Sequence, residues 1–169
     1  MRSATRTPIL SASRLQSPIG ELLAVACGDT LCGLWFADQK GIPPWALQAP
    51  MPPSPTGVLL AAQQQLNGYF SGTRKSFDLP LDFLEGTDFQ RTVWSALRQI
   101  PYGHTRSYGQ LAEAIGRPRA VRALGGAVGR NPLGILLPCH RVVGHSGALT
   151  GYTGGLDRKL ALLRLEGAL

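Results

Sequence analysis

Short apolar runs and turn signals alternate along the first half of the chain. Residues 19–26 and 31–36 are apolar and are separated by Gly28 and Asp29, a pair typical of a hairpin turn. Six prolines lie between residues 43 and 55. Because proline lacks a backbone donor, this stretch is expected to be a surface loop without helix or central strand. The pattern predicts a small sheet followed by an irregular loop.

Helical periodicity begins after this loop. Residues 58–70 place apolar side chains three and four positions apart, and Gly72 ends the segment, so we expect one helix against the sheet. Residues 77–83 have the pattern of a last strand. Residues 85–88 then combine a break with an N-cap signal for a further helix. We therefore expect a domain boundary near residue 85.

Two short amphipathic segments predict a helix-turn-helix in the second half. Ser107 caps the first helix, residues 116–118 break it, and the second helix is expected over residues 119–130. The apolar face of the first helix consists of Leu111, Ala114 and Ile115.

The second of these helices carries one long charged side chain among small residues. Val121, Leu124 and Val128 recur at helical spacing and are expected to face the core, whereas Arg122 is expected to project outward. The small residues are Ala120, Ala123, Gly125, Gly126 and Ala127. Two adjacent glycines cost about 1 kcal/mol each in helix propensity, which indicates that the thin helix approaches another backbone closely. The small residues could serve either tight packing against another helix or contact with a partner, and the sequence leaves both alternatives open.

Charge is distributed unevenly between the two halves. Residues 1–85 contain six basic and six acidic residues, whereas residues 86–169 contain eleven and four, so the net charge of +7 belongs to the second half. A basic half with a helix-turn-helix favours a nucleic acid as partner. A solvated basic face without a polyanion partner is the alternative.

The composition is typical of a globular protein outside the membrane. Of 169 residues, 44% are hydrophobic and 16% are charged, and no apolar run approaches the roughly 20 residues that span a bilayer. The basic residues 1–6 are not followed by the apolar stretch of a secretory signal. We therefore expect a cytoplasmic protein with no membrane partner.

The three cysteines, Cys27, Cys32 and Cys139, do not form the framework of a disulfide-stapled domain, and reduced thiols are expected. Cys27 and Cys32 are interpreted as buried strand cysteines. The cysteines, His140 and His145 lack the paired spacing of structural zinc sites, and the chain contains neither a GxxxxGK[ST] nor a GxGxxG motif. We expect no metal and no cofactor.

Cys139 and His140 are adjacent, which suggests a nucleophile and its base, because the thiolate is the reactive form of cysteine. In an extended segment their side chains point to opposite faces, so they can cooperate only in a tight turn, at a helix start or through a water molecule. Glu166 is a candidate for orienting His140, because residues 86–169 contain only four acidic residues. For Cys139 alone, a buried structural cysteine is the alternative.

The second half resembles the O6-alkylguanine-DNA alkyltransferases in the order and spacing of its motifs, among them Pro-Cys-His-Arg at 138–141. The resemblance is close over residues 87–169 and weaker at 17–20 and 66–70. Gly134 departs from the family pattern, since many relatives carry proline or alanine there. The matching segments are residues 86–90, 107–112, 119–125, 131–144 and 151–156.

The resemblance implies a fold and a reaction. The fold is an N-terminal ribonuclease-H-like α/β domain over residues 1–85 and a mainly α-helical, winged-helix-like domain with the helix-turn-helix over residues 86–169. The reaction is single-turnover repair, in which a cysteine takes an alkyl group from O6 of guanine in double-stranded DNA and keeps it. Activity on O4 of thymine is left open. We expect a monomer in solution, with cooperative binding along DNA left open.

The resemblance also implies roles for the reacting residues. Cys139 would accept the alkyl group, and His140 would activate Cys139 through a water molecule. Glu166 would orient His140, and Asn131 would brace the active-site turn.

A second set of residues would handle the DNA. Tyr108 would help to rotate the target nucleotide out and stabilise the leaving guanine, while Arg122 would fill the gap left in the stack. Tyr152 and Thr153 would line the guanine pocket. The second helix would enter the minor groove, where base readout is degenerate. Its small residues at the DNA would be Ala120, Ala123 and Gly125.

Two other classes of function are weighed against repair. A non-catalytic lesion binder would use the flipping residues without chemistry, and the presence of Cys139 argues against it. A cysteine hydrolase would use Cys139, His140 and Asn131 in multiple turnovers. The basic half and the helix-turn-helix argue against the hydrolase.

Overall fold

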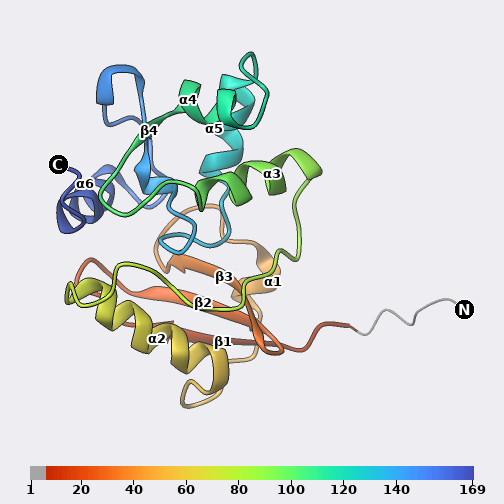
Figure 1. Cartoon of the computed structure of the whole chain (residues 1–169). Coiled ribbons are helices and arrows are strands. Elements are labelled where there is room, and N and C mark those ends of the chain that lie inside the picture. The colour runs from red at the N-terminus through yellow and green to blue at the C-terminus, as the bar shows by residue number, and fades with distance from the viewer. Residues whose placement is uncertain (1–6) are drawn as a thin grey trace, which may run out of the picture.

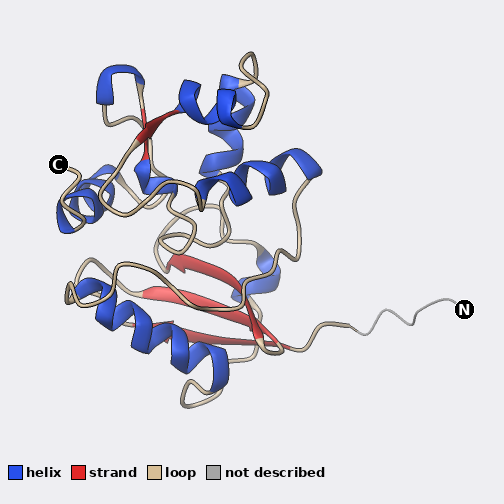
Figure 2. Cartoon of the chain, in the orientation of Figure 1, coloured by secondary structure: helices blue, strands red, loops and turns tan. Residues whose placement is uncertain are grey.

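The protein is built from two parts stacked on each other, and the computed structural model describes residues 7–169 (Figure 1). The N-terminal half holds a sheet with helices, and the C-terminal half is mainly helical (Figure 2). The basic residues 1–6 lie outside the described part. Within residues 7–169, no helix is both long enough and apolar enough to cross a membrane.

Three antiparallel strands form the N-terminal sheet, in the order β1-β2-β3. They are β1 (Leu10–Leu15), β2 (Leu22–Cys27) and β3 (Thr30–Phe36). The pairing of β2 with β3 begins with Leu22 opposite Phe36, and Gly28 adopts a φ of 58° in the turn, so the predicted hairpin is confirmed. No apolar run predicts β1, because Ser11 and Ser13 interrupt its pattern.

The predicted helix is α2 (Gly57–Phe70), which lies along the sheet (Figure 1). Its apolar positions recur three and four residues apart, so one stripe of the helix joins the core. The buried residues of this stripe are Leu59, Ala62, Leu66 and Tyr69.

The proline-rich segment contains a short helix, α1 (Pro44–Leu47). The expectation that residues 43–55 hold no helix is therefore wrong. Pro44 occupies the first position of this single turn, where a missing N–H breaks no hydrogen bond. The turn buries Ala46 beside Trp35 in a second apolar cluster on the sheet.

The strand expected over residues 77–83 is also wrong. Only Leu81 forms a bridge, parallel to Leu31 of β3. The carbonyl of Pro80 accepts a hydrogen bond from the Leu31 amide at 2.8 Å. Because Pro80 has no N–H of its own, the ladder cannot extend past it.

The C-terminal half carries the predicted helix-turn-helix, formed by α4 and α5. Its helices are α3 (Asp88–Leu97), α4 (Tyr108–Ala114), α5 (Val121–Gly129) and α6 (Leu156–Leu165). A short strand, β4 (Arg106–Ser107), pairs in parallel with β5 (Val142–Val143). Thr87 and Ser107 each close a capping box at the start of a helix, as their positions in the sequence predict.

Details of the helix-turn-helix differ from the prediction. The backbone of Ala120 is not helical, so α5 begins at Val121, and Val121 is 39% exposed instead of facing the core. In α4 the buried residue beside Leu111 is Ala112, whereas Ala114 is exposed. Ala114 lies about 60° around the helix from Leu111 and Ala112 about 100°, so helical position alone favours Ala114, and the packing of neighbouring elements decides that Ala112 is the one covered.

The two halves share one hydrophobic core and are joined by polar contacts. The Leu34 amide donates to the Pro132 carbonyl at 2.8 Å, and the Gly134 amide donates to the Leu34 carbonyl at 2.9 Å. Arg158 of α6 forms an ion pair with Asp38, with 2.6 Å between Nη1 and Oδ1. The edge strand β3 thus pairs with the segment that leads to Cys139.

The capping box of α3 gives a stability prediction. Thr87 Oγ1 accepts from the Gln90 amide at 3.1 Å, so Thr87→Ala should lower the free energy of unfolding by about 1 kcal/mol. Urea denaturation measures this loss. Thr56→Ala is the matched control, because Thr56 caps α2 without a side-chain hydrogen bond. An equal loss in both variants would contradict the assignment of the cap.

Candidate active site around Cys139

Cys139 begins a single 3-10 turn, Cys139–Arg141, that follows a tightly hydrogen-bonded segment. Cys139 and His140 thus lie in a tight turn, one of the arrangements that the sequence left open. The Cys139 amide donates to the Leu137 carbonyl at 2.7 Å, and only 8% of the residue is exposed. The thiol is therefore held in a fixed place within the core.

His140 and Glu166 form a buried hydrogen-bonded pair. His140 Nε2 lies 2.7 Å from Glu166 Oε2, and neither side chain is exposed. Arg141 donates from Nε to Glu166 Oε1 at 2.6 Å and from Nη2 to Oε2 at 3.1 Å. The Tyr69 hydroxyl of α2 donates to Oε2 at 2.9 Å. The pairing of His140 with Glu166, expected from the sequence, is present, whereas Arg141 and Tyr69 were not predicted to join it.

The charges of this network determine which nitrogen of His140 carries the proton. Burial opposes ionisation of Glu166, but the hydrogen bonds from His140 and Arg141 outweigh it and lower its pKa to about 2. Burial lowers the pKa of His140, so the neutral ring is favoured. An ionised carboxylate accepts only, and Nε2 of His140 therefore donates. Nδ1 is buried, has no hydrogen-bond partner within residues 7–169 and is left as an acceptor.

The surroundings of the Cys139 thiol have opposing effects on its pKa. Burial raises the pKa of Cys139, which disfavours the thiolate. A hydrogen bond from Asn131, the positive charge of Lys159 and the backbone amides of the turn lower this pKa. The resting cysteine is protonated at neutral pH, so a reaction at the sulfur needs a group that removes the proton.

Asn131 braces the segment before Cys139, as expected. Its Nδ2 donates to the Leu137 carbonyl at 2.8 Å, and its Oδ1 accepts from the Leu133 amide at 3.0 Å. The segment between them contains Ile135 with a φ of 69°, a conformation that β-branched residues rarely adopt. The Asn131 side chain thus bridges a strained, buried turn.

A cavity of about 380 Å³ opens beside Cys139. The predicted residues that line it are Tyr108, Gly125, Asn131, Cys139, Tyr152 and Thr153. Burial raises the pKa of Tyr152, so its hydroxyl stays protonated. Thr153 Oγ1 donates to the Gly129 carbonyl at 2.7 Å, which ties this wall to the end of α5.

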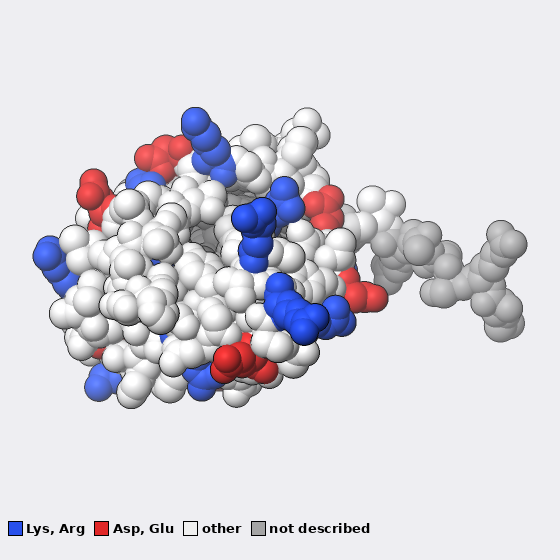
Figure 3. Space-filling model, turned by 90° about the horizontal axis from the view of Figure 1, so that it is seen from above, with Lys and Arg blue, Asp and Glu red and all other residues white. Residues whose placement is uncertain are grey.

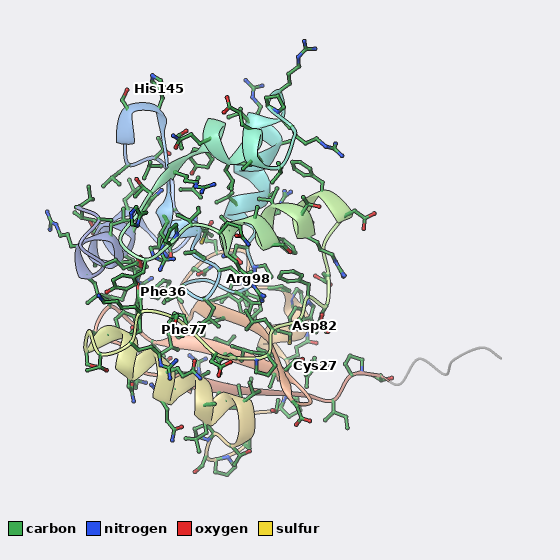
Figure 4. The ribbon with its side chains drawn as sticks, in the orientation of Figure 1. Cys27, Phe36, Phe77, Asp82, Arg98 and His145 are labelled. Atoms are coloured by element: carbon green, nitrogen blue, oxygen red, sulfur yellow. The ribbon has the colours of Figure 1, made fainter. Side chains whose placement is uncertain are left out.

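The N-terminal half supplies the opposite wall of the same cavity. Its lining residues are Leu22, Leu34, Trp35, Phe36 and Gln39. Phe36, labelled in Figure 4, lies between the sheet and the C-terminal half, and the Arg158 guanidinium stands 4.2 Å from the centre of its ring. No motif in the sequence singles these residues out, because four of them follow the pattern of ordinary strand core positions and Gln39 lies in the loop after β3.

Three of the predicted DNA-binding residues lie outside this cavity. Ala123 and Arg122 are exposed on α5, and Ala120 is half-buried at its start. Arg122 lines a separate surface hollow together with Tyr108 and Gly125. Figure 3 looks down on this half, and several Lys and Arg side chains stand around a hollow in the face. Tyr108 and Gly125 line both hollows, so they connect the surface to the cysteine cavity.

Lys159 is a further buried residue that sequence reasoning missed. It has no exposed surface, and its Nζ donates to the Val142 carbonyl at 2.6 Å and to the Thr150 carbonyl at 3.1 Å. Burial lowers the pKa of Lys159, and the nearby Cys139 raises it. The side chain connects the strand after the cysteine turn with the loop before Tyr152. A fully buried lysine at helical spacing carries no sequence signal that separates it from an exposed one.

The remaining cysteines lie away from this site. Cys27 and Cys32 are free thiols in the sheet; Cys32 is buried as expected, but Cys27 is only half-buried. Burial raises the pKa of Cys32 to about 12. Within residues 7–169, no group of three or more His, Cys, Asp and Glu side chains is arranged to hold a metal ion.

Comparison with known proteins identifies both halves. Residues 12–83 match a family model described as "6-O-methylguanine DNA methyltransferase, ribonuclease-like domain", and residues 88–168 match "6-O-methylguanine DNA methyltransferase, DNA binding domain". The methylated-DNA–protein-cysteine methyltransferase of Mycobacterium tuberculosis is 51% identical over 152 residues, covering 90% of this chain and 89% of that protein. The constitutive enzyme of the same name from Bacillus subtilis is 43% identical, covering 89% and 92%.

Solved structures give the same result. The crystal structure of the Mycobacterium tuberculosis O6-methylguanine methyltransferase superposes with a TM-score of 0.84 at 46% identity, covering 94% of this chain and 93% of that one. The structure of the Mycobacterium tuberculosis protein in complex with DNA superposes equally well, with a TM-score of 0.84. With an N-terminal sheet domain, a C-terminal helical DNA-binding domain and matches over nearly its whole length, the chain belongs to the methylated-DNA–protein-cysteine methyltransferase family.

Proposed function

We propose that this protein repairs alkylated DNA directly, by transferring the alkyl group from O6 of guanine to Cys139. The observation that carries the proposal is the Cys139 thiol in the wall of a cavity, beside a buried His140–Glu166 pair whose Nδ1 is free to accept a proton. A protein that transfers an alkyl group to its own cysteine needs a base that removes the thiol proton, because burial disfavours the thiolate of Cys139.

The proposed reaction forms one bond and breaks one. The Cys139 proton passes through a water molecule to His140 Nδ1, and the thiolate attacks the alkyl carbon. A carbon–sulfur bond forms while the bond between that carbon and guanine O6 breaks, and its electron pair stays on the guanine. The Tyr108 hydroxyl donates a hydrogen bond to the leaving guanine anion, which takes up a proton from solvent, and His140 releases the proton of Cys139 to solvent. The protein keeps the alkyl group as a thioether and therefore acts once.

The residues around the cavity have proposed roles in this step. Glu166 keeps Nε2 of His140 protonated and so presents Nδ1 as the base. Asn131 holds the turn and donates toward the thiolate. Tyr152 and Thr153 form the wall against which the guanine lies.

The DNA is proposed to bind across α5 through its minor groove. The small residues Ala120, Ala123 and Gly125 leave room for the backbone of the duplex, and Arg122 enters the stack in place of the extruded nucleotide. Extrusion through the hollow next to Tyr108 would bring the base to the cavity beside Cys139. This arrangement requires no sequence-specific contact.

The proposed domains divide at residue 85. Residues 1–85 would form a ribonuclease-H-like domain and residues 86–169 a winged-helix-like domain; the two family matches, which end at 83 and begin at 88, support this division. The protein is proposed to act as a monomer, since all the residues assigned above come from one chain.

Alkyl transfer is tested with a duplex that contains O6-methylguanine. The Cys139 peptide of the wild type should gain one methyl group by mass spectrometry, with a plateau of about one per protein, and Cys139→Ala should gain none. Cys27→Ser is the matched control, because Cys27 is a free thiol remote from the cavity. An unmodified Cys139 peptide from a protein that still binds the duplex would instead indicate a lesion binder, and multiple turnover on an ester would indicate a hydrolase.

Arg122→Ala should slow transfer from duplex DNA about tenfold at saturating DNA, because base extrusion loses the side chain that fills the gap. Its transfer rate from the free O6-methylguanine base should be unchanged, since that substrate needs no extrusion. Single-turnover kinetics on both substrates measure the two effects. Equal slowing on both would place Arg122 in the chemical step instead.

Binding to DNA should weaken with salt. If about four arginines contact phosphates, log K should fall against log salt with a slope near −3.6, roughly a hundredfold between 50 and 200 mM. Arg119 is exposed at the approach to α5, so Arg119→Ala should reduce the slope by about 0.9. Fluorescence anisotropy with an undamaged duplex measures both slopes, and an affinity insensitive to salt would contradict the proposed surface.

A further inference from the structure

Tyr69 is a residue of the N-terminal half whose side chain reaches the buried network behind Cys139. It lies in the last turns of α2, has no exposed surface and donates its hydroxyl proton to Glu166 Oε2 at 2.9 Å. Burial, together with the negative charge of Glu166, raises the pKa of Tyr69 well above its usual range, so the hydroxyl remains a donor. The weak N-terminal motif that contains Tyr69 has no assigned role in the reaction above.

Oε2 of Glu166 accepts from four donor atoms of three residues at once. His140 Nε2 lies at 2.7 Å, the Tyr69 hydroxyl at 2.9 Å, Arg141 Nη2 at 3.1 Å and Arg141 Nε at 3.4 Å. A carboxylate oxygen offers about two lone-pair directions, so these donors must share its electron density. A stronger bond to one donor therefore weakens the bonds to the others.

We propose that Tyr69 is a positioning residue that sets how strongly Glu166 holds His140, and thereby how basic Nδ1 of His140 is. This inference rests on the proposed function, in which Nδ1 receives the proton of Cys139. Through Tyr69 the N-terminal half would take part in the reaction without touching the substrate.

The groups that face His140 show why this hydroxyl matters. Glu166 favours a proton on the ring, whereas the charges of Arg141 and Lys159 oppose it. Arg141 donates to Glu166 through Nε and Nη2, and Lys159 donates to two backbone carbonyls. Tyr69 is thus the neutral donor in the set, and its removal changes the basicity of His140 without changing any charge.

Tyr69→Phe removes the hydroxyl and keeps the ring. Oε2 should then bind His140 Nε2–H more strongly, and this proton should move downfield in the NMR spectrum of protein labelled with ¹⁵N-histidine. The acid limb of the pH–rate profile for methyl transfer should move up by about half a pH unit, because a stronger Glu166 bond raises the pKa of His140. Because Nδ1 is then a better base for the Cys139 proton, the plateau at higher pH should rise by up to about threefold, while the rate well below the limb stays close to that of the wild type.

Tyr102→Phe is the matched control. The Tyr102 hydroxyl is partly buried and donates to the Leu165 carbonyl at 3.3 Å, one residue from Glu166, without touching the carboxylate. Both variants should lose stability in thermal unfolding, but only Tyr69→Phe should shift the Nε2–H resonance and the acid limb. If Tyr69→Phe loses stability with both readouts unchanged, or if Tyr102→Phe shifts them equally, the proposal is overturned.

A second variant covers the case in which Tyr69→Phe does not fold. Site-specific 3-fluorotyrosine at position 69 makes the hydroxyl a stronger donor, so the Nε2–H resonance and the acid limb should move in the opposite direction. A shift in the same direction as for Tyr69→Phe, or none, contradicts the proposal. The NMR comparison needs no DNA. If the wild-type protein transferred no methyl group, the proposed function would be contradicted, but the coupling of Tyr69 to His140 could still be tested.

Discussion

The carboxylate of Glu166 is a negative charge inside the protein, and much of the structure is arranged around it. An unpaired buried charge costs several kcal/mol, so it persists only where donors surround it. Here the donors come from the cysteine turn, through His140 and Arg141, and from α2, through Tyr69. The C-terminal end of α6, the active-site turn and a helix of the N-terminal half must therefore meet at one point.

This requirement links packing to chemistry. The same hydrogen bonds that make the buried charge tolerable also keep a proton on Nε2 of His140 and leave Nδ1 bare. Cys139 lies in the same turn, where burial holds the thiol in its protonated, unreactive form. Such an arrangement suits a protein that uses its cysteine once, because a thiol exposed as a permanent thiolate would be lost to oxidation before meeting its substrate.

The two halves differ in charge and shape, and each contributes a different part of the site. The C-terminal half holds the basic excess and the thin helix α5, while the N-terminal half closes the cavity with apolar side chains from β2 and β3. The pairing of Leu34 with Pro132 and Gly134 fixes this wall to the segment that carries Cys139. A backbone ladder is well suited to this role, because it constrains position without adding a group that would react or need neutralising.

Local signals in the sequence were sufficient for many of the elements. The β2–β3 turn, α2 and the two capped helices follow from residues close to one another, such as Gly28, Thr87 and Ser107. The predictions failed for two different reasons, one local and one set by distant packing. Residues 77–83 have the composition of a strand, but Pro80 limits them to a single bridge, and the exposure of Ala114 depends on what packs against α4.

The sequence by itself determined which chemical groups are available: a cysteine next to a histidine, a basic second half, and a helix of mostly small residues that carries Arg122. The tertiary structure alone decided which groups meet. It places Tyr69 and Lys159 behind the cysteine turn and makes Trp35 a wall of its cavity. These residues lie far from Cys139 along the chain, and their burial depends on how helices and sheet pack, which no short pattern encodes.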